Sequence, residues 1–124
     1  MKRIYIAGKL NDEACNYIKN CHRMIVIADM LRKAGFAVFV PCFDILGGML
    51  AGDWEYNHYF DNSQPWLEVA DAVVLVPGWE TSAGTKREIT LAREKGIPVY
   101  EFRVFCDEFI TNIPREYKTR FRNG

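Results

Sequence analysis

Short apolar runs that alternate with helical segments constrain the fold of this chain more than any other feature of its sequence. The runs lie at residues 3–7, 36–40, 72–76 and 97–102, and they are rich in β-branched and aromatic residues. Pro41 stops the second run and Pro77 stops the third, so both are predicted to be fully buried strands. Strands separated by helices form a parallel sheet, because a parallel connection needs a long crossover.

Two intervening segments are predicted to be helices. In residues 14–34 apolar side chains recur at steps of three and four residues, and Gly35 follows where a helix C-cap is expected. Gly96 follows residues 85–95 in the same way, and a short third helix is predicted over 65–70. The sequence therefore predicts an α/β fold of flavodoxin-like or Rossmann-like type. Its parallel sheet would have four to five strands, with helices on both faces.

The length and composition fit one globular domain. We expect this domain to span residues 1–124, with 103–124 as a C-terminal tail that carries a helical turn at 107–110. Sixteen Lys and Arg balance sixteen Asp and Glu. This balance leaves no net field to attract a nucleic acid polymer or an anionic membrane, so neither is an expected partner.

The apolar runs and the cysteines exclude further classes of protein. No run is long enough to span a membrane, and the start of the chain has no signal-peptide h-region, so we expect a cytoplasmic protein. The four cysteines form no C-x-x-C pair, and no histidine stands at zinc-ligand spacing from them. We therefore predict reduced structural thiols, no metal site and no cofactor.

Residues 77–88 are the most informative candidate for a ligand site. Their sequence, Pro-Gly-Trp-Glu-Thr-Ser-Ala-Gly-Thr-Lys-Arg-Glu, runs from a strand end through a loop of small residues into a helix. Open parallel sheets bind ligands at the carboxyl ends of their strands, and a helix start offers free N–H groups to an anion. Ser82 and Thr85 add hydroxyl groups, and Gly84 allows close approach to the backbone. We predict a phosphate-binding loop here.

A structural alternative exists for the same residues. Thr85-x-x-Glu88 has the spacing of a capping box, in which each side chain bonds a backbone N–H of the other residue. Spacing alone does not decide between a cap and a catalytic role for Glu88.

Three segments resemble the signature regions of the nucleoside 2-deoxyribosyltransferase-like superfamily, which includes nucleoside 5'-monophosphate N-glycosidase-like and small DUF4406-like proteins. The resemblance extends over about residues 3–101. The segments are Ile4-Tyr5-Ile6-Ala7-Gly8, Ala70-Asp71-Ala72-Val73-Val74-Leu75 and Ser82-x-Gly84-x-x-x-Glu88-x-x-x-Ala92.

The resemblance implies a glutamate nucleophile at Glu88. Its carboxylate would attack the anomeric carbon of a nucleoside sugar and form a covalent glycosyl-enzyme, as retaining glycosidases do. It also implies that Tyr5 orients this carboxylate. A core aromatic residue is the structural alternative for Tyr5.

Residue 82 indicates the kind of substrate. In this superfamily, members that act on free nucleosides usually have Asp at this position, and members that hydrolyse nucleoside 5'-monophosphates have Ser. Ser82 therefore predicts a small-molecule nucleotide as the ligand, since a hydroxyl group does not repel phosphate. The loop that begins at Gly8 is expected to line the site, with Lys9 as a positive charge; a solvated lysine is the alternative.

The chain departs from the pattern of the resemblance at one place. Nucleotide-hydrolysing members tend to have Asp eight residues before the position of Asp71, and here that residue is Ser63. Either Asp61 takes this role, or the acid step is done differently or not at all. Asp71 is a further candidate for substrate binding, with the opening of a strand as its alternative.

Several aromatic side chains are candidates for stacking on the base. They are Trp54, Tyr56, His58 and Trp79. Covering the edge of the sheet is the alternative for this group. His58 also titrates near neutral pH, although an exposed loop histidine is its ordinary explanation.

The leading function is hydrolysis or transfer at the N-glycosidic bond of a nucleoside 5'-monophosphate. The loop 77–88 is also similar, more weakly, to the motif of phosphoribohydrolases that activate cytokinins. A catalytically inactive nucleotide sensor of the same fold is the alternative from another class. The resemblance implies a homodimer or higher oligomer, for which the aromatic tail residues Phe105, Phe109, Tyr117 and Phe121 are candidate contacts.

Overall fold

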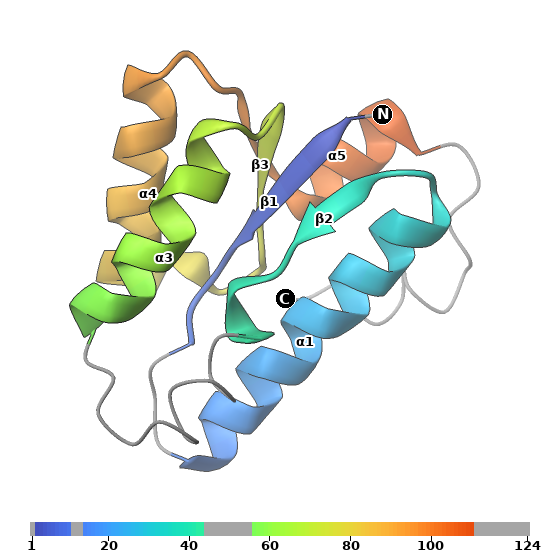
Figure 1. Cartoon of the computed structure of the whole chain (residues 1–124). Helices are drawn as coiled ribbons and strands as arrows, with labels where there is room; N and C mark the ends of the chain where they lie inside the picture. Colours follow the sequence, from blue (N-terminus) through green and yellow to red (C-terminus); the bar gives the residue numbers. More distant parts are fainter. Residues whose placement is uncertain (1, 11–13, 44–55, 111–124) are drawn as a thin grey trace.

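A computed structural model of the chain describes residues 2–10, 14–43 and 56–110, and it shows a parallel sheet of four strands in the order β2-β1-β3-β4 (Figure 1). All three neighbouring pairs are parallel. The strands are β1 (Arg3–Ala7), β2 (Ala37–Phe39), β3 (Ala72–Leu75) and β4 (Val99–Glu101). This confirms the predicted α/β class, and the strand order is that of the flavodoxin-like type.

Helices cover both faces of the sheet, as predicted. Figure 1 shows α1 and α5 on one side of the strands and α3 and α4 on the other. The helices are α1 (Ala14–Lys33), α3 (Tyr56–Glu68), α4 (Ala83–Glu94) and α5 (Phe102–Phe109), with short 3₁₀ helices η1 (Pro41–Phe43) and η2 (Trp79–Thr81). None of the described helices is both long and apolar enough to cross a membrane.

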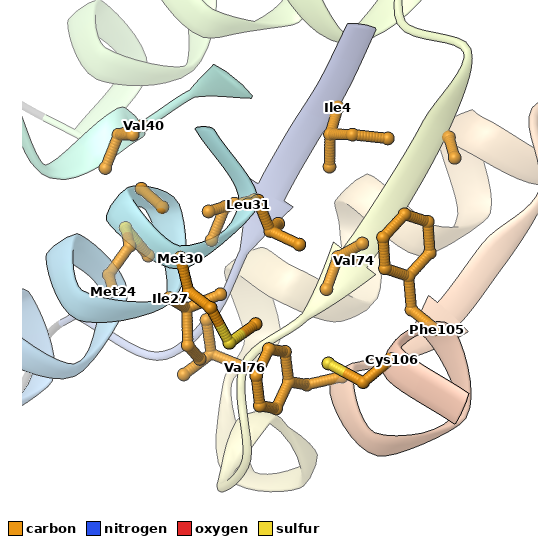
Figure 2. Close-up of a cluster of buried hydrophobic side chains, with 14 of the residues drawn as sticks. Ile4, Met24, Ile27, Met30, Leu31, Val40, Val74, Val76, Phe105 and Cys106 are labelled. Atoms are coloured by element: carbon orange, nitrogen blue, oxygen red, sulfur yellow. The ribbon is translucent and has the colours of Figure 1, made fainter. Parts of the chain in front are cut away.

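The alternation of side chains along the strands divides the interior into two cores. We call them the α1/α5 core and the α3/α4 core after the helices that close them. The α1/α5 core includes Ile4, Ile6, Met24, Ile27, Leu31, Val74, Val76, Phe105 and Cys106, and Figure 2 shows the side chains of α1 and α5 gathered against the strands. The α3/α4 core includes Tyr5, Ala7, Leu67, Val73, Leu75, Ile89, Ala92 and Ile97.

Both predicted glycine caps are confirmed. Gly35 has φ 100° and Gly96 has φ 71°, which is the left-handed backbone that ends a helix in a Schellman motif. After α1, the N–H of Phe36 donates to the carbonyl of Leu31 at 3.1 Å. After α4, the N–H of Ile97 donates to the carbonyl of Ala92 at 2.8 Å. Each cap turns the chain directly towards the next strand.

The prediction that residues 36–40 form a fully buried strand was wrong. β2 is only three residues long and lies at the edge of the sheet, with Ala37 exposed. An edge strand is covered on fewer sides than a central one, and the apolar run alone does not distinguish the two positions. β3, which lies between β1 and β4, is fully buried as predicted.

Two helices are longer than predicted. α3 begins at Tyr56 instead of residue 65 and contains Pro65 in its interior, where Pro was expected to mark a helix start. α5 begins at Phe102, directly after β4, and the predicted turn at 107–110 is only its last part. Phe105 is 2% exposed in the α1/α5 core, so its prediction as a subunit contact was wrong.

The carboxyl ends of β1 and β3 form the topological switch point of the sheet. These two strands are neighbours, and the chain leaves them in opposite directions, from β1 through α1 to β2 and from β3 through α4 to β4. Because α1 and α4 lie on opposite faces, their connections separate at this place. Open parallel sheets bind their ligands in the crevice that results.

Gly8 allows the chain to pass closely over β3 at the switch point. An alanine at position 8 would place its Cβ 2.7 Å from the Cβ of Val76, and both atoms are fixed to the backbone. We therefore expect Gly8→Ala to lower the free energy of unfolding by about 1–3 kcal/mol, as overpacking does. Urea unfolding measures this change, and an unaltered midpoint would contradict the close approach.

Candidate active site

Ser82 begins helix α4. It is the N-cap residue, and its Oγ accepts a hydrogen bond from the backbone N–H of Thr85 at 3.2 Å. The hydroxyl of Thr85 also donates to the Oγ of Ser82, at 2.9 Å, and Thr85 itself is buried. The helix therefore starts at Ala83, two residues before the predicted start at Thr85.

This helix start excludes the capping box that was the structural alternative for Glu88. Thr85 is the third residue of the helix and donates to the actual cap, while Glu88 is the sixth. A side chain at the sixth position lies beyond the first turn, and the backbone N–H groups there already bond within the helix. The role of the Glu88 side chain is therefore not capping, and the residues around it indicate a different one.

The carboxyl group of Glu88 lies against the buried hydroxyl of Tyr5. Tyr5 is 0% exposed, in the middle of β1, and its side chain enters the α3/α4 core, where its hydroxyl lies near enough to Glu88 to favour the charged form of the carboxyl group. Burial raises the pKa of Glu88 from 4.5 to about 7, and the influence of the Tyr5 hydroxyl opposes this rise. The carboxyl group is therefore close to half ionised at neutral pH.

Stacked rings fix the plane of Tyr5. Its ring lies 5.4 Å from that of Phe39 at an angle of 18°, and Phe39 in turn lies 5.8 Å from Trp66 at 16°. Trp66 is 53% exposed, so the stack leads from the interior to the surface. Tyr5 thus belongs to the core, which was its alternative, and its hydroxyl also lies near Glu88.

Asp61 is not brought to Glu88. It is exposed on α3, whereas Ser63 is buried and donates its hydroxyl to the carbonyl of Phe60 at 3.3 Å. Residues two apart on a helix point about 200° from one another, so Asp61 does not take the place of residue 63. α3 instead contacts α4 through Phe60, whose ring lies 3.7 Å from the guanidinium carbon of Arg87.

Asp71 lies at the opposite end of the sheet from the switch point. Its Oδ2 accepts a hydrogen bond from the backbone N–H of Arg3 at 2.6 Å, and its Oδ1 lies 3.6 Å from the Arg3 guanidinium. The hydrogen bond from the backbone of Arg3 is the main cause of its lowered pKa. Asp71 therefore opens β3 at the amino ends of the strands, which was the alternative to substrate binding.

Four further candidate residues from the sequence are Lys9, Trp79, His58 and Trp54. Lys9 is half-buried in the loop after β1 and is engaged with another group, so it is not a fully solvated lysine. Trp79 is half-buried and packs against the α3/α4 core. The backbone of His58 lies in α3, but its side chain is outside what the structure describes, as is Trp54.

Arg23 is a residue of this region that the sequence analysis missed. It extends from α1, and its Nη1 donates to the carbonyl of Pro77 at 3.0 Å, where the chain leaves β3. Its position in the sequence could have indicated partial burial, because Arg23 is one residue before Met24 and four before Ile27 and so borders the buried stripe of α1. In the parts of the chain that the structure describes, no three His, Cys, Asp or Glu side chains gather to hold a metal ion.

Comparisons with known proteins agree with this architecture. A family model described as "Domain of unknown function (DUF4406)" matches residues 2–101. A solved 2-deoxyribosyltransferase from the psychrotolerant bacterium Bacillus psychrosaccharolyticus is 21% identical, with a TM-score of 0.57 over 80% of this chain and 70% of that chain. No curated protein matches the sequence. The predicted nucleoside 2-deoxyribosyltransferase-like fold is therefore confirmed.

Removing the hydroxyl of Tyr5 is expected to raise the pKa of Glu88 above about 7, because the carboxylate would lose the neighbouring hydroxyl that favours its charge. Carbon-13 NMR titration of the glutamate carboxyl groups in Tyr5→Phe measures this pKa. Tyr100→Phe is the matched control, since Tyr100 packs against the α1/α5 core. An equal rise in both variants would contradict the influence of the Tyr5 hydroxyl.

The raised pKa of Glu88 also makes stability depend on pH. Between pH 4.5 and about 7 the folded chain holds a proton that the unfolded chain releases, so this contribution to stability is lost as pH rises. We expect the difference in the free energy of unfolding between Glu88→Gln and the native protein to shift in favour of the variant by about 2–3 kcal/mol as the pH rises from about 5 to about 8. Urea unfolding at both pH values tests this, with Glu94→Gln as the exposed control on the same helix. A gain that is equal at both pH values would contradict the raised pKa.

Proposed function

The chain belongs to the DUF4406 family, and on this premise and the geometry of Glu88 we propose that it is an enzyme that cleaves the N-glycosidic bond of a nucleoside 5'-monophosphate. The similar solved structure is a 2-deoxyribosyltransferase, whose fold this chain shares. Hydrolysis of the bond releases the free base, and transfer of the sugar to a second base is the related outcome.

The observation that carries the proposal is the carboxyl group of Glu88, half-buried beside the hydroxyl of Tyr5. Its pKa of about 7 leaves a large ionised fraction at neutral pH, in surroundings that hydrate the charge poorly. The Tyr5 hydroxyl favours the charged form of this carboxyl group. Such a group is suited to attack an electron-poor carbon nearby.

The proposed reaction has two steps. An oxygen of the Glu88 carboxylate bonds to the anomeric carbon of the sugar as the bond from that carbon to the base nitrogen breaks, and the base leaves with the electron pair and takes up a proton. Water or a second base then attacks the same carbon, the ester bond to Glu88 breaks, and the attacking group gives up its proton. The carboxylate is restored without oxidation or reduction.

The start of α4 supports a phosphate as part of the substrate. The Oγ of Ser82 accepts two hydrogen bonds, from the N–H and the hydroxyl of Thr85. A serine hydroxyl has two acceptor sites and one donor, so the group of Ser82 that remains is its O–H. This O–H can donate a hydrogen bond to an acceptor on a ligand, such as a phosphate oxygen near the positive end of the helix.

A nucleotide sensor is the second candidate function. The buried Ser63, in place of the Asp of nucleotide-hydrolysing relatives, and the exposed Asp61 favour it, because neither supplies an acid beside Glu88. A sensor would bind the same nucleotides and release no base.

The first experiment separates these two functions. We would incubate the protein with ribo- and deoxyribonucleoside 5'-monophosphates and measure free base by chromatography. We expect release that increases as pH rises through about 7, and a loss of about 10³-fold or more in Glu88→Gln. Glu94→Gln, on the exposed side of α4, is the matched control and should retain the native rate.

Two outcomes would contradict the proposal, one its nucleophile and the other the enzyme itself. Base release that persists in Glu88→Gln would exclude the nucleophile. Nucleotide binding without release from any substrate would favour the sensor.

We also propose that the protein forms a homo-oligomer. The described surface has several exposed apolar side chains on which a second copy could pack: Ile18, Ile25, Trp66, Val69 and Val104. Tyr117 and Phe121, expected at the interface, lie outside the described residues.

A further inference from the structure

Arg23 reaches the switch point of the sheet from the face opposite to Glu88. α1 packs on the α1/α5 core, whereas Glu88 comes from α4 on the other face. The guanidinium of Arg23 donates to the carbonyl of Pro77 at 3.0 Å, and its Nη1 lies 3.5 Å from where a Cβ on Gly78 would be. The side chain therefore lies against the turn that leads from β3 into η2 and α4.

The same side of α1 contacts both loops of the switch point. Asn20, three residues before Arg23, has its Nδ2 3.5 Å from the carbonyl of Leu10 in the loop after β1. Residues three apart share a face of a helix, so this face of α1 runs across the carboxyl ends of β1 and β3. Arg23 thus lies against the chain where it leaves β3 and not on the outer surface of the helix.

Most of the hydrogen-bonding capacity of Arg23 is unused within the described chain. A guanidinium has five N–H donors, and the bond to Pro77 uses one of them. Arg23 is half-buried, and among the described residues it forms no ion pair with a carboxylate. A half-buried positive charge is costly unless an anion pairs with it.

The charges beside Arg23 agree with an anionic ligand. Lys9, which is engaged with another group, belongs to the loop after β1, the strand next to β3, and is half-buried. Glu80, in the turn η2, is exposed, so water screens its charge. Of these three charged groups, the positive ones, Arg23 and Lys9, are partly withdrawn from solvent, and Glu80 is not.

We propose that Arg23 is a specificity-determining residue that binds the phosphate of the nucleotide substrate; this inference rests on the proposed function. The bond to Pro77 holds the guanidinium in place, and the remaining N–H groups pair with two phosphate oxygens. Arg23 would then distinguish a nucleoside 5'-monophosphate from the free nucleoside, while Ser82 approaches the same phosphate from α4.

The test compares the affinity for nucleotide with the affinity for nucleoside. Calorimetry in the Glu88→Gln background measures the Kd of a nucleoside 5'-monophosphate and of its free nucleoside without turnover. We expect Arg23→Met to weaken nucleotide binding by about 10- to 100-fold and to change nucleoside binding by less than about 2-fold. Arg23→Lys keeps the charge without the planar fork and should lose less.

Arg32→Met is the matched control. Arg32 is also on α1 and also donates to a backbone carbonyl, that of Val38 at 3.3 Å, but it lies in the last turn of the helix, away from the switch point. Its replacement should leave both affinities at the native values. If Arg23→Met does not fold, as judged by circular dichroism, the comparison of Arg23→Lys with Arg32→Lys takes its place.

The outcomes separate this inference from the proposed function. If both affinities of Arg23→Met fall in parallel, Arg23 only supports the turn, and the inference is overturned whether or not the native protein releases base. If only nucleotide binding falls and the native protein releases no base, the inference stands and the enzyme does not. A native protein that binds no nucleotide overturns both.

Discussion

The nearness of the Tyr5 hydroxyl to the Glu88 carboxyl group joins the centre of the sheet to the helix that covers it, and the electrostatics of the candidate site depend on it. Tyr5 is held by its strand and by its stack on Phe39, so its hydroxyl has a fixed position. Glu88 reaches that position because Ser82 sets the start of α4. Burial and the Tyr5 hydroxyl then act on the carboxyl group in opposite directions, and burial is the larger effect.

This arrangement is unfavourable for stability in the pH range in which a carboxylate nucleophile is useful. Ionisation of Glu88 in the folded chain is harder than in the unfolded chain, so the charged site is a cost that the rest of the fold must offset. Its neighbours Ile89 and Ala92 on α4 are buried in the α3/α4 core, and each buried aliphatic side chain of the size of isoleucine contributes about 1.5–3 kcal/mol. Apolar burial on the same helix is therefore of the right size to tolerate one such carboxyl group.

Local features of the sequence predicted most of the fold, and features that depend on tertiary packing escaped it. The four strands and the caps at Gly35 and Gly96 follow from short apolar runs and from one backbone conformation, which the sequence displays directly. The length of α3 does not, because among its described side chains, 60–68, only Ser63 and Leu67 are buried, four residues apart in an otherwise polar and aromatic segment. Glu88, Tyr5 and their pairing were expected from a family resemblance, but the raised pKa of Glu88 needed the structure. Arg23 and Pro77 are 54 residues apart, and only the packing of α1 against the end of β3 brings them together.

The source of the pKa of Glu88 distinguishes this site from one built on two carboxylates. In a carboxylate pair, repulsion between like charges raises one pKa, and the two groups divide the roles of nucleophile and acid. Here the causes are burial and the hydroxyl of Tyr5, and among the described residues no second carboxylate contributes. Asp61 points away on α3, and Asp71 is at the far end of the sheet. A single carboxyl group does not act as nucleophile and as proton donor to the leaving base in the same step, since the first role needs the charged form and the second the neutral form. In the proposed reaction, protonation of the base therefore has to come from solvent, from the substrate or from a group outside the described residues, because Glu88 serves the attack on the sugar.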